Sequence, residues 1–425
     1  MTGSPSHAVI PGLRWREVCR LCDSPRLDFA LSITATPPAN ALVPADQLDA
    51  HETEYPLDVY VCADCGHAQL LGIVDPRALF SHYLYVSGTS PVFVDHLRAY
   101  AEDVVTAYAV PRDSLVVEVG SNDGTFLRCF QQLGMRVLGV DPAANIAAEA
   151  SAAGIPTVNA FFTPELAAEL RTRHGAASLV VANNVFAHID DLHGVFEGVR
   201  TLLAPDGMLV FEVGYFVAVA GGTLFDTIYH EHLSYHTVRP LIPFLARHGL
   251  ELFDVQRNLS QGGSIRVFAQ PAGAGRTVTS RVAELCTLEE HELGAHPLVG
   301  ARRLGERIER ARAALTSLLG ELRAQGRRAA AYGAPAKATT LMYHFGLTRD
   351  AIPYIVDDNP RKQGLFTPGL HVPVVAADVL RDPERRPEYL LILAWNFADS
   401  IIQNNGWFAE AGGRWIIPLP ELRIV

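Results

Sequence analysis

The central part of the chain alternates short apolar runs with longer Ala- and Leu-rich stretches. The runs have the length and composition of β-strands, and the stretches between them have helical spacing. Such alternation predicts a parallel sheet with covering helices, to which further runs at 250–256 and 264–269 could add strands. The four main runs are Leu115–Val119, Arg136–Val140, Leu179–Ala182 and Met208–Val213.

A second alternation follows a long stretch, residues 280–325, that is rich in Arg, Glu, Leu and Ala at helical spacing. It predicts a second, smaller α/β unit, with helices near 336–345 and 397–411. The strands expected there are Arg328–Tyr332, Tyr354–Val356, Tyr389–Ala394 and Arg414–Ile417.

The region before both alternations, residues 13–75, is rich in turns and contains only short strand-like runs such as Asp58–Val61. These changes of texture predict three parts. They are a small N-terminal domain over 13–75, a central domain over 76–280, and a helical connector with a smaller α/β domain over 281–425. The length of 425 residues accommodates them at roughly 100–200 residues per domain.

Composition narrows the classes of function. Hydrophobic residues make up 49% of the chain and charged residues 19%, which predicts a sizeable core and excludes global disorder. A net charge of −11 argues against nucleic acid as a partner. No apolar run reaches the roughly 18–20 residues of a membrane span, and the first residues lack the pattern of a signal peptide. We therefore expect a cytoplasmic protein without a membrane partner.

Four of the six cysteines form two CxxC pairs, Cys19 with Cys22 and Cys62 with Cys65. In a reduced compartment such pairs are more often metal ligands than disulfides. Four thiolates make a closed tetrahedral zinc site, which is typical of a structural metal. Unrelated buried thiols and a redox pair are the alternatives.

A small-residue turn follows the first predicted strand, and an acid ends the next. Glu118, Gly120, Asn122 and Gly124 lie in or beside the turn, and Asp141 follows about 20 residues on. This plan suits a nucleotide cofactor, whose ribose hydroxyls the acid would bind. The turn lacks the glycines of a dinucleotide fingerprint, and instead resembles the first and second motifs of class I S-adenosylmethionine methyltransferases. An ordinary strand turn is the alternative.

Two histidines, a carboxylate and two phenols lie within residues 229–235, just beyond the last strand of the first alternation. An HExxH metalloprotease motif is excluded, because Ser234 stands where the second histidine should be. A metal-binding HxH pair and a hydrogen-bonded loop remain open. We favour general acid/base chemistry, for which His and Glu are the expected side chains.

In the smaller α/β unit, the turn from Gly333 to Lys337 and the segment 356–362 combine a glycine, a helix start and nearby lysines. These features suit a diphosphate, with Lys337 as the expected contact. An interdomain salt-bridge surface is the alternative. Trp395 and Asn396, after a strand, either flank a base or sugar or lie in the core.

Together these motifs resemble the C-methyltransferases of antibiotic deoxysugar biosynthesis, and the resemblance runs nearly end to end. It implies an α/β fold with a small N-terminal zinc-binding domain, a central class I methyltransferase Rossmann-like domain and a smaller C-terminal Rossmann-like domain. Besides the loop at 229–232, the segments that carry it are 83–88, Asn184–His188, Gln261–Ser264 and Tyr332–Lys337.

The resemblance also implies roles for single residues. S-adenosylmethionine would bind the first sheet, with Asn184 beside the turn residues, and the sugar nucleotide would lie between the central and C-terminal parts. His232 would be the base. Around the sugar we expect Tyr229, Glu231, His188 and Tyr85, and on the rest of the substrate Lys337, Tyr332, Gly333 and Trp395.

The expected reaction is S-adenosylmethionine-dependent methylation of a dTDP-4-keto-deoxysugar at the carbon next to the ketone. Attack at C-3 is the first expectation and attack at C-5 the second. His232 would remove the proton to form an enolate. The alternatives are an NAD(P)-dependent sugar-nucleotide epimerase or reductase and a non-catalytic zinc-containing scaffold. We expect a monomer or a weak oligomer.

Overall fold

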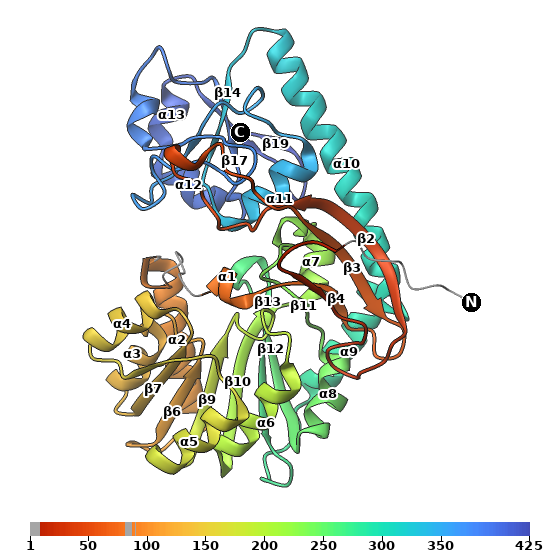
Figure 1. Cartoon of the computed structure of the whole chain (residues 1–425), viewed down its shortest axis with the longest axis vertical. Coiled ribbons are helices and arrows are strands. Elements are labelled where there is room, and N and C mark those ends of the chain that lie inside the picture. Colours follow the sequence, from red (N-terminus) through yellow and green to blue (C-terminus); the bar gives the residue numbers. More distant parts are fainter. Residues whose placement is uncertain (1–8, 81–86, 90) are drawn as a thin grey trace.

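A seven-stranded sheet, in the order β12-β13-β10-β9-β6-β7-β8, is formed by the middle part of the chain and lies in the lower half of Figure 1. Six of the seven strands run in the same direction, and only β13 runs antiparallel to its two neighbours, β10 and β12. The computed structural model describes residues 9–80, 87–89 and 91–425. The strands are β6 (Leu115–Val119), β7 (Arg136–Asp141), β8 (Thr157–Asn159), β9 (Ala177–Asn183), β10 (Leu203–Gly214), β12 (Leu250–Asn258) and β13 (Ser264–Pro271).

Helices cover both faces of this sheet, which explains why its strands are continuous apolar runs. Val116 and Val117, adjacent in β6, belong to separate core clusters on opposite faces. Phe126 lies in the same cluster as Val116, and Phe196 lies in the same cluster as Val117. The helices of this central unit are α2 (Pro91–Ala107), α3 (Thr125–Gln132), α4 (Ala144–Ala152), α5 (Pro164–His174), α6 (Leu192–Leu202), α7 (Phe216–Gly222) and α8 (Val238–Arg247). The predicted central sheet is confirmed, including its two later strands.

A six-stranded sheet in the order β16-β15-β14-β17-β18-β19 forms the C-terminal unit. All its pairings are parallel except that of β19 with β18. The four predicted strands are present, whereas β16 and β19, two residues each, are too short to produce a pattern. The elements are β14 (Ala329–Tyr332), α11 (Ala336–Phe345), β15 (Ile355–Val356), β16 (Val374–Val375), β17 (Tyr389–Ile392), α12 (Ala398–Asn404), α13 (Gly406–Glu410), β18 (Arg414–Ile417) and β19 (Arg423–Ile424).

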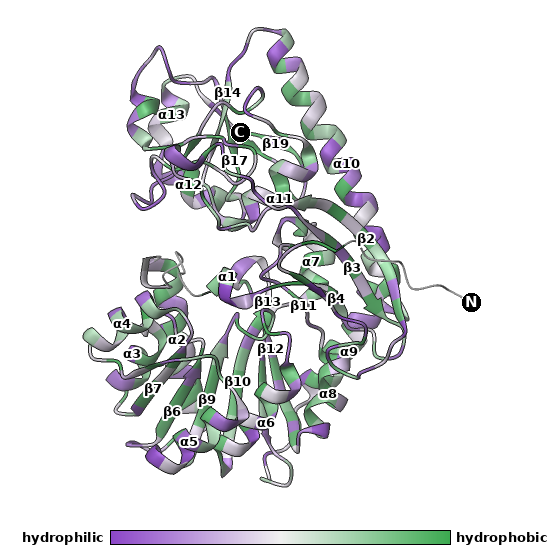
Figure 2. Ribbon diagram, viewed as in Figure 1, coloured by the Kyte–Doolittle hydropathy of each residue, from purple (hydrophilic) through white to green (hydrophobic). Residues whose placement is uncertain are grey.

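Two helices, α9 (Ser280–Leu293) and α10 (Pro297–Ala324), connect the central and C-terminal units. In Figure 1 the long α10 runs beside the N-terminal strands and up to the C-terminal sheet. Figure 2 shows hydrophobic residues along the strands of the central sheet and mixed colours along α10. This mixture matches a helix with one buried and one solvated face. Within the described residues, no helix combines the length and apolar character that a bilayer crossing requires.

The N-terminal unit is built on a four-stranded antiparallel sheet, in the order β11-β4-β3-β2. The sequence predicted only short strands here, because two register shifts against β3 interrupt the alternation of buried and exposed residues along β2. Its edge strand β11 comes from the central unit. The strands are β1 (Leu13–Trp15), β2 (Leu27–Thr36), β3 (Tyr55–Cys62), β4 (Ala68–Leu70), β5 (Gly72–Val74) and β11 (Ser234–Tyr235), of which β1 pairs with β5.

Candidate active site

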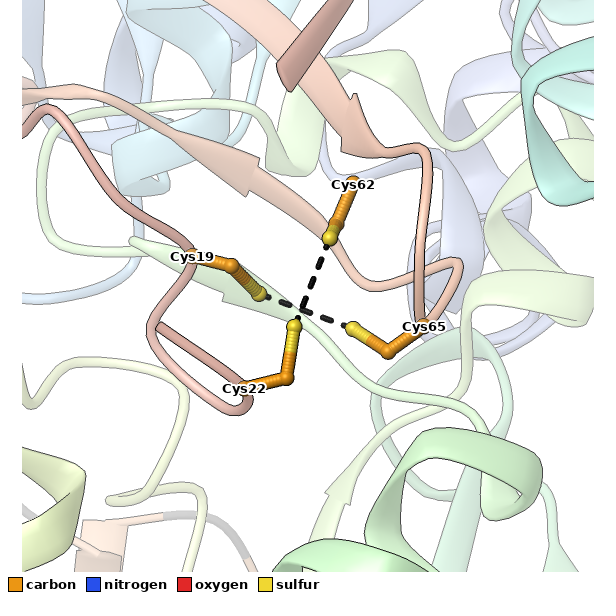
Figure 3. Close-up of side chains that lie close together, drawn as sticks. All are labelled: Cys19, Cys22, Cys62 and Cys65. Carbon is orange, nitrogen blue, oxygen red and sulfur yellow. Dashed lines mark hydrogen bonds between the residues drawn. The ribbon is translucent and has the colours of Figure 1, made fainter. Parts of the chain in front are cut away.

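The four paired cysteines meet in the N-terminal unit, with their sulfur atoms directed to a common centre (Figure 3). The Sγ atoms of Cys19 and Cys65 are 3.6 Å apart, those of Cys22 and Cys62 are 3.5 Å apart, and all four lie within 4.8 Å of one another. A tetrahedron with Zn–S bonds of about 2.3 Å has edges of about 3.8 Å. The thiols therefore fit a zinc ion, and the predicted four-cysteine zinc site is confirmed.

A cavity of about 1690 Å³ lies between the central and C-terminal units. The carboxyl ends of the central strands form its floor, which is where ligands bind in open α/β sheets. Arg14, Asn40 and Phe80 reach it from the N-terminal side, and the segments 334–339 and 358–362 line it from the C-terminal unit.

The turn after β6 lines one end of this cavity. Gly120 has φ +68°, and a Cβ there would collide with Val185. Gly124 has φ +74°, and its Cβ would lie 2.9 Å from Cγ2 of Ile155. Asn122 adopts φ +49°, which asparagine tolerates better than most residues. Glycine is therefore required at two of the predicted positions, and the turn exposes its backbone to a ligand.

Asp141, at the end of β7, ties this turn to the next one. Its Oδ2 accepts a hydrogen bond of 2.8 Å from the backbone N–H of Asn122, and its Oδ1 accepts one of 2.9 Å from that of Ala143. Burial raises the pKa of the carboxyl group above its usual value. Asp141 also lines the cavity, and each carboxylate oxygen can accept a second hydrogen bond, so the group can still bind a hydroxyl.

Glu118 supplies a second buried carboxylate on this wall. Only 3% of the residue is exposed, and Oε2 accepts no hydrogen bond from the described residues. Burial, together with Asp123 and Asp141, raises its pKa well above the usual value. An unsatisfied carboxylate beside a cavity calls for a donor or a cation from a ligand. Asn184, with φ +54°, lines the same region. These residues fit S-adenosylmethionine, which carries an ammonium, a sulfonium and ribose hydroxyls.

His232 lies farther along the cavity, and its hydrogen bonds fix its tautomer. Nδ1 lies 2.7 Å from the carbonyl oxygen of Thr227, which can only accept, so Nδ1 carries the proton. In the neutral ring Nε2 therefore has the lone pair, and the Tyr229 hydroxyl lies 3.1 Å from it. Burial lowers the pKa of His232 to about 4, which keeps the imidazole neutral near pH 7. His232 and Tyr229 both line the cavity, where a neutral imidazole and a phenol are hydrogen-bonded to each other.

His188 faces His232 from the loop after β9. The two ring centres are 5.0 Å apart, and Phe80 stacks on the other side of His188 with centres 5.7 Å apart. Burial, and then His232, lowers the pKa of His188 well below its usual value. Its buried Nε2 has no hydrogen-bond partner among the described residues. A second neutral imidazole thus lines the cavity, and its Nε2 can form a hydrogen bond to a ligand.

Two other predicted members of this cluster are placed differently. Glu231 is buried and accepts a hydrogen bond of 2.6 Å from Nδ2 of Asn40, but it does not line the cavity. Tyr85 lies outside the described residues. Of the motif around it, Ser87 donates its N–H to Oδ1 of Asn122 at 2.9 Å, so this segment contacts the turn after β6.

On the C-terminal wall, Lys337 is the predicted residue that reaches the cavity. Its Nζ donates to Oδ1 of Asn396 at 2.6 Å and lies 4.4 Å from the centre of the Trp395 ring. Burial lowers the pKa of Lys337, against the opposing effect of Asp226. Trp395 lies behind the wall and donates its Nε1–H to Oδ2 of Asp226 at 2.6 Å.

Tyr332 and Gly333 also lie behind this wall. The Tyr332 hydroxyl donates to Oδ2 of Asp358 at 2.8 Å, and Asp358 lines the cavity in its place. Gly333 has φ +86°, and a Cβ there would lie 2.8 Å from Cβ of Ala394. Both residues support the wall without facing its interior.

Sequence reasoning missed two residues that the geometry brings into the site, Asp226 and Thr227, whereas it named Asn396, which lines the cavity. Asp226 belongs to the polar cluster before His232, so its residue type was a usable signal. Thr227 acts through its carbonyl oxygen, which leaves no mark in a sequence. Among the described residues, His230 and His232 belong to no group of metal ligands, because His230 Nε2 is bound to the carbonyl oxygen of Tyr55.

Comparison with known proteins assigns the chain to a family. Family models match three successive parts: a zinc binding domain over residues 19–80, a methyltransferase domain over 93–255, and a C-methyltransferase C-terminal domain over 259–420. C-methyltransferase NovU of Streptomyces niveus is 40% identical over 407 residues, which are 96% of this chain and 96% of NovU.

Solved methyltransferase structures also match, over two fifths of the chain. Magnesium protoporphyrin IX methyltransferase from Synechocystis PCC 6803 covers 41% of this chain and 81% of its own, at 15% identity and a TM-score of 0.33. The CcbJ methyltransferase from Streptomyces caelestis covers 42% and 90%, at 17% identity and a TM-score of 0.33. On the strength of the full-length similarity to NovU and the methyltransferase domain, this chain belongs to the family of S-adenosylmethionine-dependent C-methyltransferases that includes NovU.

Proposed function

We propose that the protein methylates a dTDP-4-keto-deoxysugar at the carbon next to the ketone, with C-3 as the first expectation and C-5 as the second. The observation that carries the proposal is the hydrogen-bonded series Thr227–His232–Tyr229, which places a neutral imidazole on the cavity with the Tyr229 hydroxyl donating to its Nε2. His232 lines the same cavity as Glu118 and Asp141 of the central unit and Lys337 of the C-terminal unit.

The residue types suit the chemistry of carbon methylation. A carbon nucleophile requires loss of a proton, and a proton next to a ketone is the accessible one. We propose that Nε2 of His232 takes this proton while the C–H electron pair moves into an enolate. The hydroxyl of Tyr229 and the free Nε2 of His188 are the groups available to stabilise the enolate oxygen. S-adenosylmethionine, which the wall with Glu118 and Asp141 would hold, would supply the methyl group to the enolate carbon and leave as S-adenosylhomocysteine.

Charge on the opposite wall supports a sugar nucleotide as the substrate. Lys337, Arg361 and Lys362 line the cavity from the C-terminal unit, close to the first turn of α11. Cationic side chains and the amino end of a helix suit a diphosphate. The substrate would then span the cavity, with its diphosphate on this wall and its sugar at His232.

Two measurements test the proposal. Titration calorimetry should show binding of S-adenosylhomocysteine and none of NAD or NADP. The protein with S-adenosylhomocysteine and a dTDP-4-keto-6-deoxyhexose in D₂O should then exchange one proton next to the ketone, measured by mass spectrometry. Absence of exchange, with S-adenosylhomocysteine bound, would contradict the enolate mechanism. Binding of NAD or NADP alone would revive the epimerase or reductase alternative, which the family assignment disfavours.

A further inference from the structure

Arg20 lies between the two cysteines of the first CxxC pair, Cys19 and Cys22. Its side chain is 0% exposed. An arginine is almost never fully buried unless it is paired, so its partners define its role.

One set of partners belongs to the loop of His232. Nη1 of Arg20 donates to the carbonyl oxygens of Leu70, in β4, and of Leu233, at 3.3 Å from the latter. Leu233 directly follows His232, and its carbonyl oxygen also accepts the N–H of Leu70 at 3.0 Å. Gln69, also in β4, accepts at Oε1 from the backbone N–H of Arg20 at 3.1 Å and from its Nη1 at 3.2 Å. Arg20 thus holds the point where the His232 loop enters the N-terminal sheet.

A further partner belongs to the loop of His188. Nε of Arg20 donates to Oδ1 of Asp190 at 3.0 Å. Asp190 is also paired with Arg14, which lines the cavity, and with Arg16, whose Nη1 lies 3.1 Å from Oδ1. Three cations on one carboxylate keep it ionised and hold the end of the His188 loop in place.

The two loops are also bonded to each other, beside Arg20. The carbonyl oxygen of Ala187 accepts the N–H of Leu233 at 2.7 Å and that of Ser234 at 3.1 Å. This backbone contact therefore sets the separation of the two histidine rings. Arg20 is bonded to both loops beside it, to Asp190 in one and to Leu233 in the other. The guanidinium is suited to this task, because its donors form a rigid planar fork that can serve several acceptors at once.

We propose that Arg20 is a positioning residue, which holds the His188 and His232 loops in register and thereby couples the four-cysteine site to the catalytic chemistry. The inference rests on the proposed role of His232. It gives the zinc-binding turn a part in catalysis in addition to folding, because Cys19 and Cys22 fix the backbone from which Arg20 extends.

The test compares Arg20→Lys and Arg20→Met with Arg26→Gln in the full-length zinc-loaded protein. Arg26 is a suitable control because it lies in the same unit, pairs with Asp64 and is 67% exposed. Zinc content and S-adenosylhomocysteine affinity should stay unchanged in all three variants. Methyl transfer by both Arg20 variants should fall about 100-fold in kcat, the effect of a catalytic group displaced by about 1 Å, while KM for S-adenosylmethionine stays the same.

A spectroscopic measurement separates this inference from the proposed function. In protein labelled with ¹⁵N-histidine, His232→Asn identifies the signals of His232. The Arg20 variants should shift these signals, and Arg26→Gln should not. Unmoved signals with wild-type kcat would overturn the inference, and so would loss of zinc in both Arg20 variants, since Arg20 would then serve folding alone. If His232→Asn kept its activity, the proposed base would fail while a signal shift would still report positioning.

Discussion

The Nζ atom of Lys337 lies 3.7 Å from Oδ2 of Asp226, so a cation on the C-terminal wall is paired with the loop that carries His232. Asp226 is fully buried and directly precedes Thr227, whose carbonyl oxygen orients His232. Thr340, in α11, donates to the carbonyl oxygen of Ile228 at 3.1 Å. The C-terminal unit therefore holds the loop on both sides of Thr227.

Asp226→Asn should destabilise the protein, because it leaves the Lys337 cation buried without its counterion. We expect a loss of about 3 kcal/mol, as for other buried pairs from which one partner is removed. Thermal unfolding, followed by calorimetry, should show a lower Tm. Asp226→Asn combined with Lys337→Met should recover part of the loss, since neither charge is then buried alone. If the double variant were as unstable as the two single losses added together, the pair would contribute nothing.

His232→Asn should abolish methyl transfer while leaving the affinity for S-adenosylhomocysteine near that of the wild type. The amide can still donate to Thr227, but it offers no basic nitrogen in place of Nε2, and loss of a general base typically costs about 100- to 10,000-fold. A radiolabelled methyl-transfer assay beside calorimetry measures both properties. His230→Gln is the matched control, because His230 binds the carbonyl oxygen of Tyr55 and does not line the cavity. Substantial activity in His232→Asn would reassign the base, and His188 would be the candidate because it lines the cavity and Glu231 does not.

Buried histidines should make the fold sensitive to acid. Burial lowers the pKa values of His230, His232 and His236 to about 4, from 6.5 in the unfolded chain. Between these values the unfolded chain binds more protons than the folded one, so stability should fall as pH decreases from 6.5 to 4. Tm measured by calorimetry across this window tests the expectation, and His236→Gln should make the slope shallower. A constant Tm from pH 6.5 to 5 would contradict it.

Cys62→Ser should lower the yield of folded protein and its zinc content, because a structural zinc contributes directly to the free energy of folding. Cys62 ends β3, so loss of the metal should loosen the sheet that β11 completes. Elemental analysis and Tm measure the two effects. Cys286→Ser is the control, since Cys286 is a partly buried thiol outside the four-cysteine group. A stable, active, zinc-free Cys62→Ser protein would show that the metal is an accessory.

The two α/β units were predictable because their buried strands are continuous apolar runs between helices. The N-terminal sheet was harder to predict, because the bulges of β2 interrupt the alternation of buried and exposed residues along that strand. Its edge strand β11 is also distant in sequence from the other strands. In the site, residue type led to His232 and Lys337 on the cavity wall. It gave no means of telling Trp395, behind the wall, from Asn396, which lines it. Contacts made by backbone atoms, such as the carbonyl oxygen of Thr227, leave no trace in residue type.

The pairing of β4 with β11 also constrains how the chain is made and how it can be recombined. Ser234 follows His67, its hydrogen-bond partner, by 167 residues. During synthesis, the edge of β4 that pairs with β11 therefore stays unpaired until most of the central unit has left the ribosome. A chimaera that takes its zinc-binding segment from a relative would also have to match a strand that the host supplies. An exchange of the zinc-binding segment would thus have to include its distant strand β11.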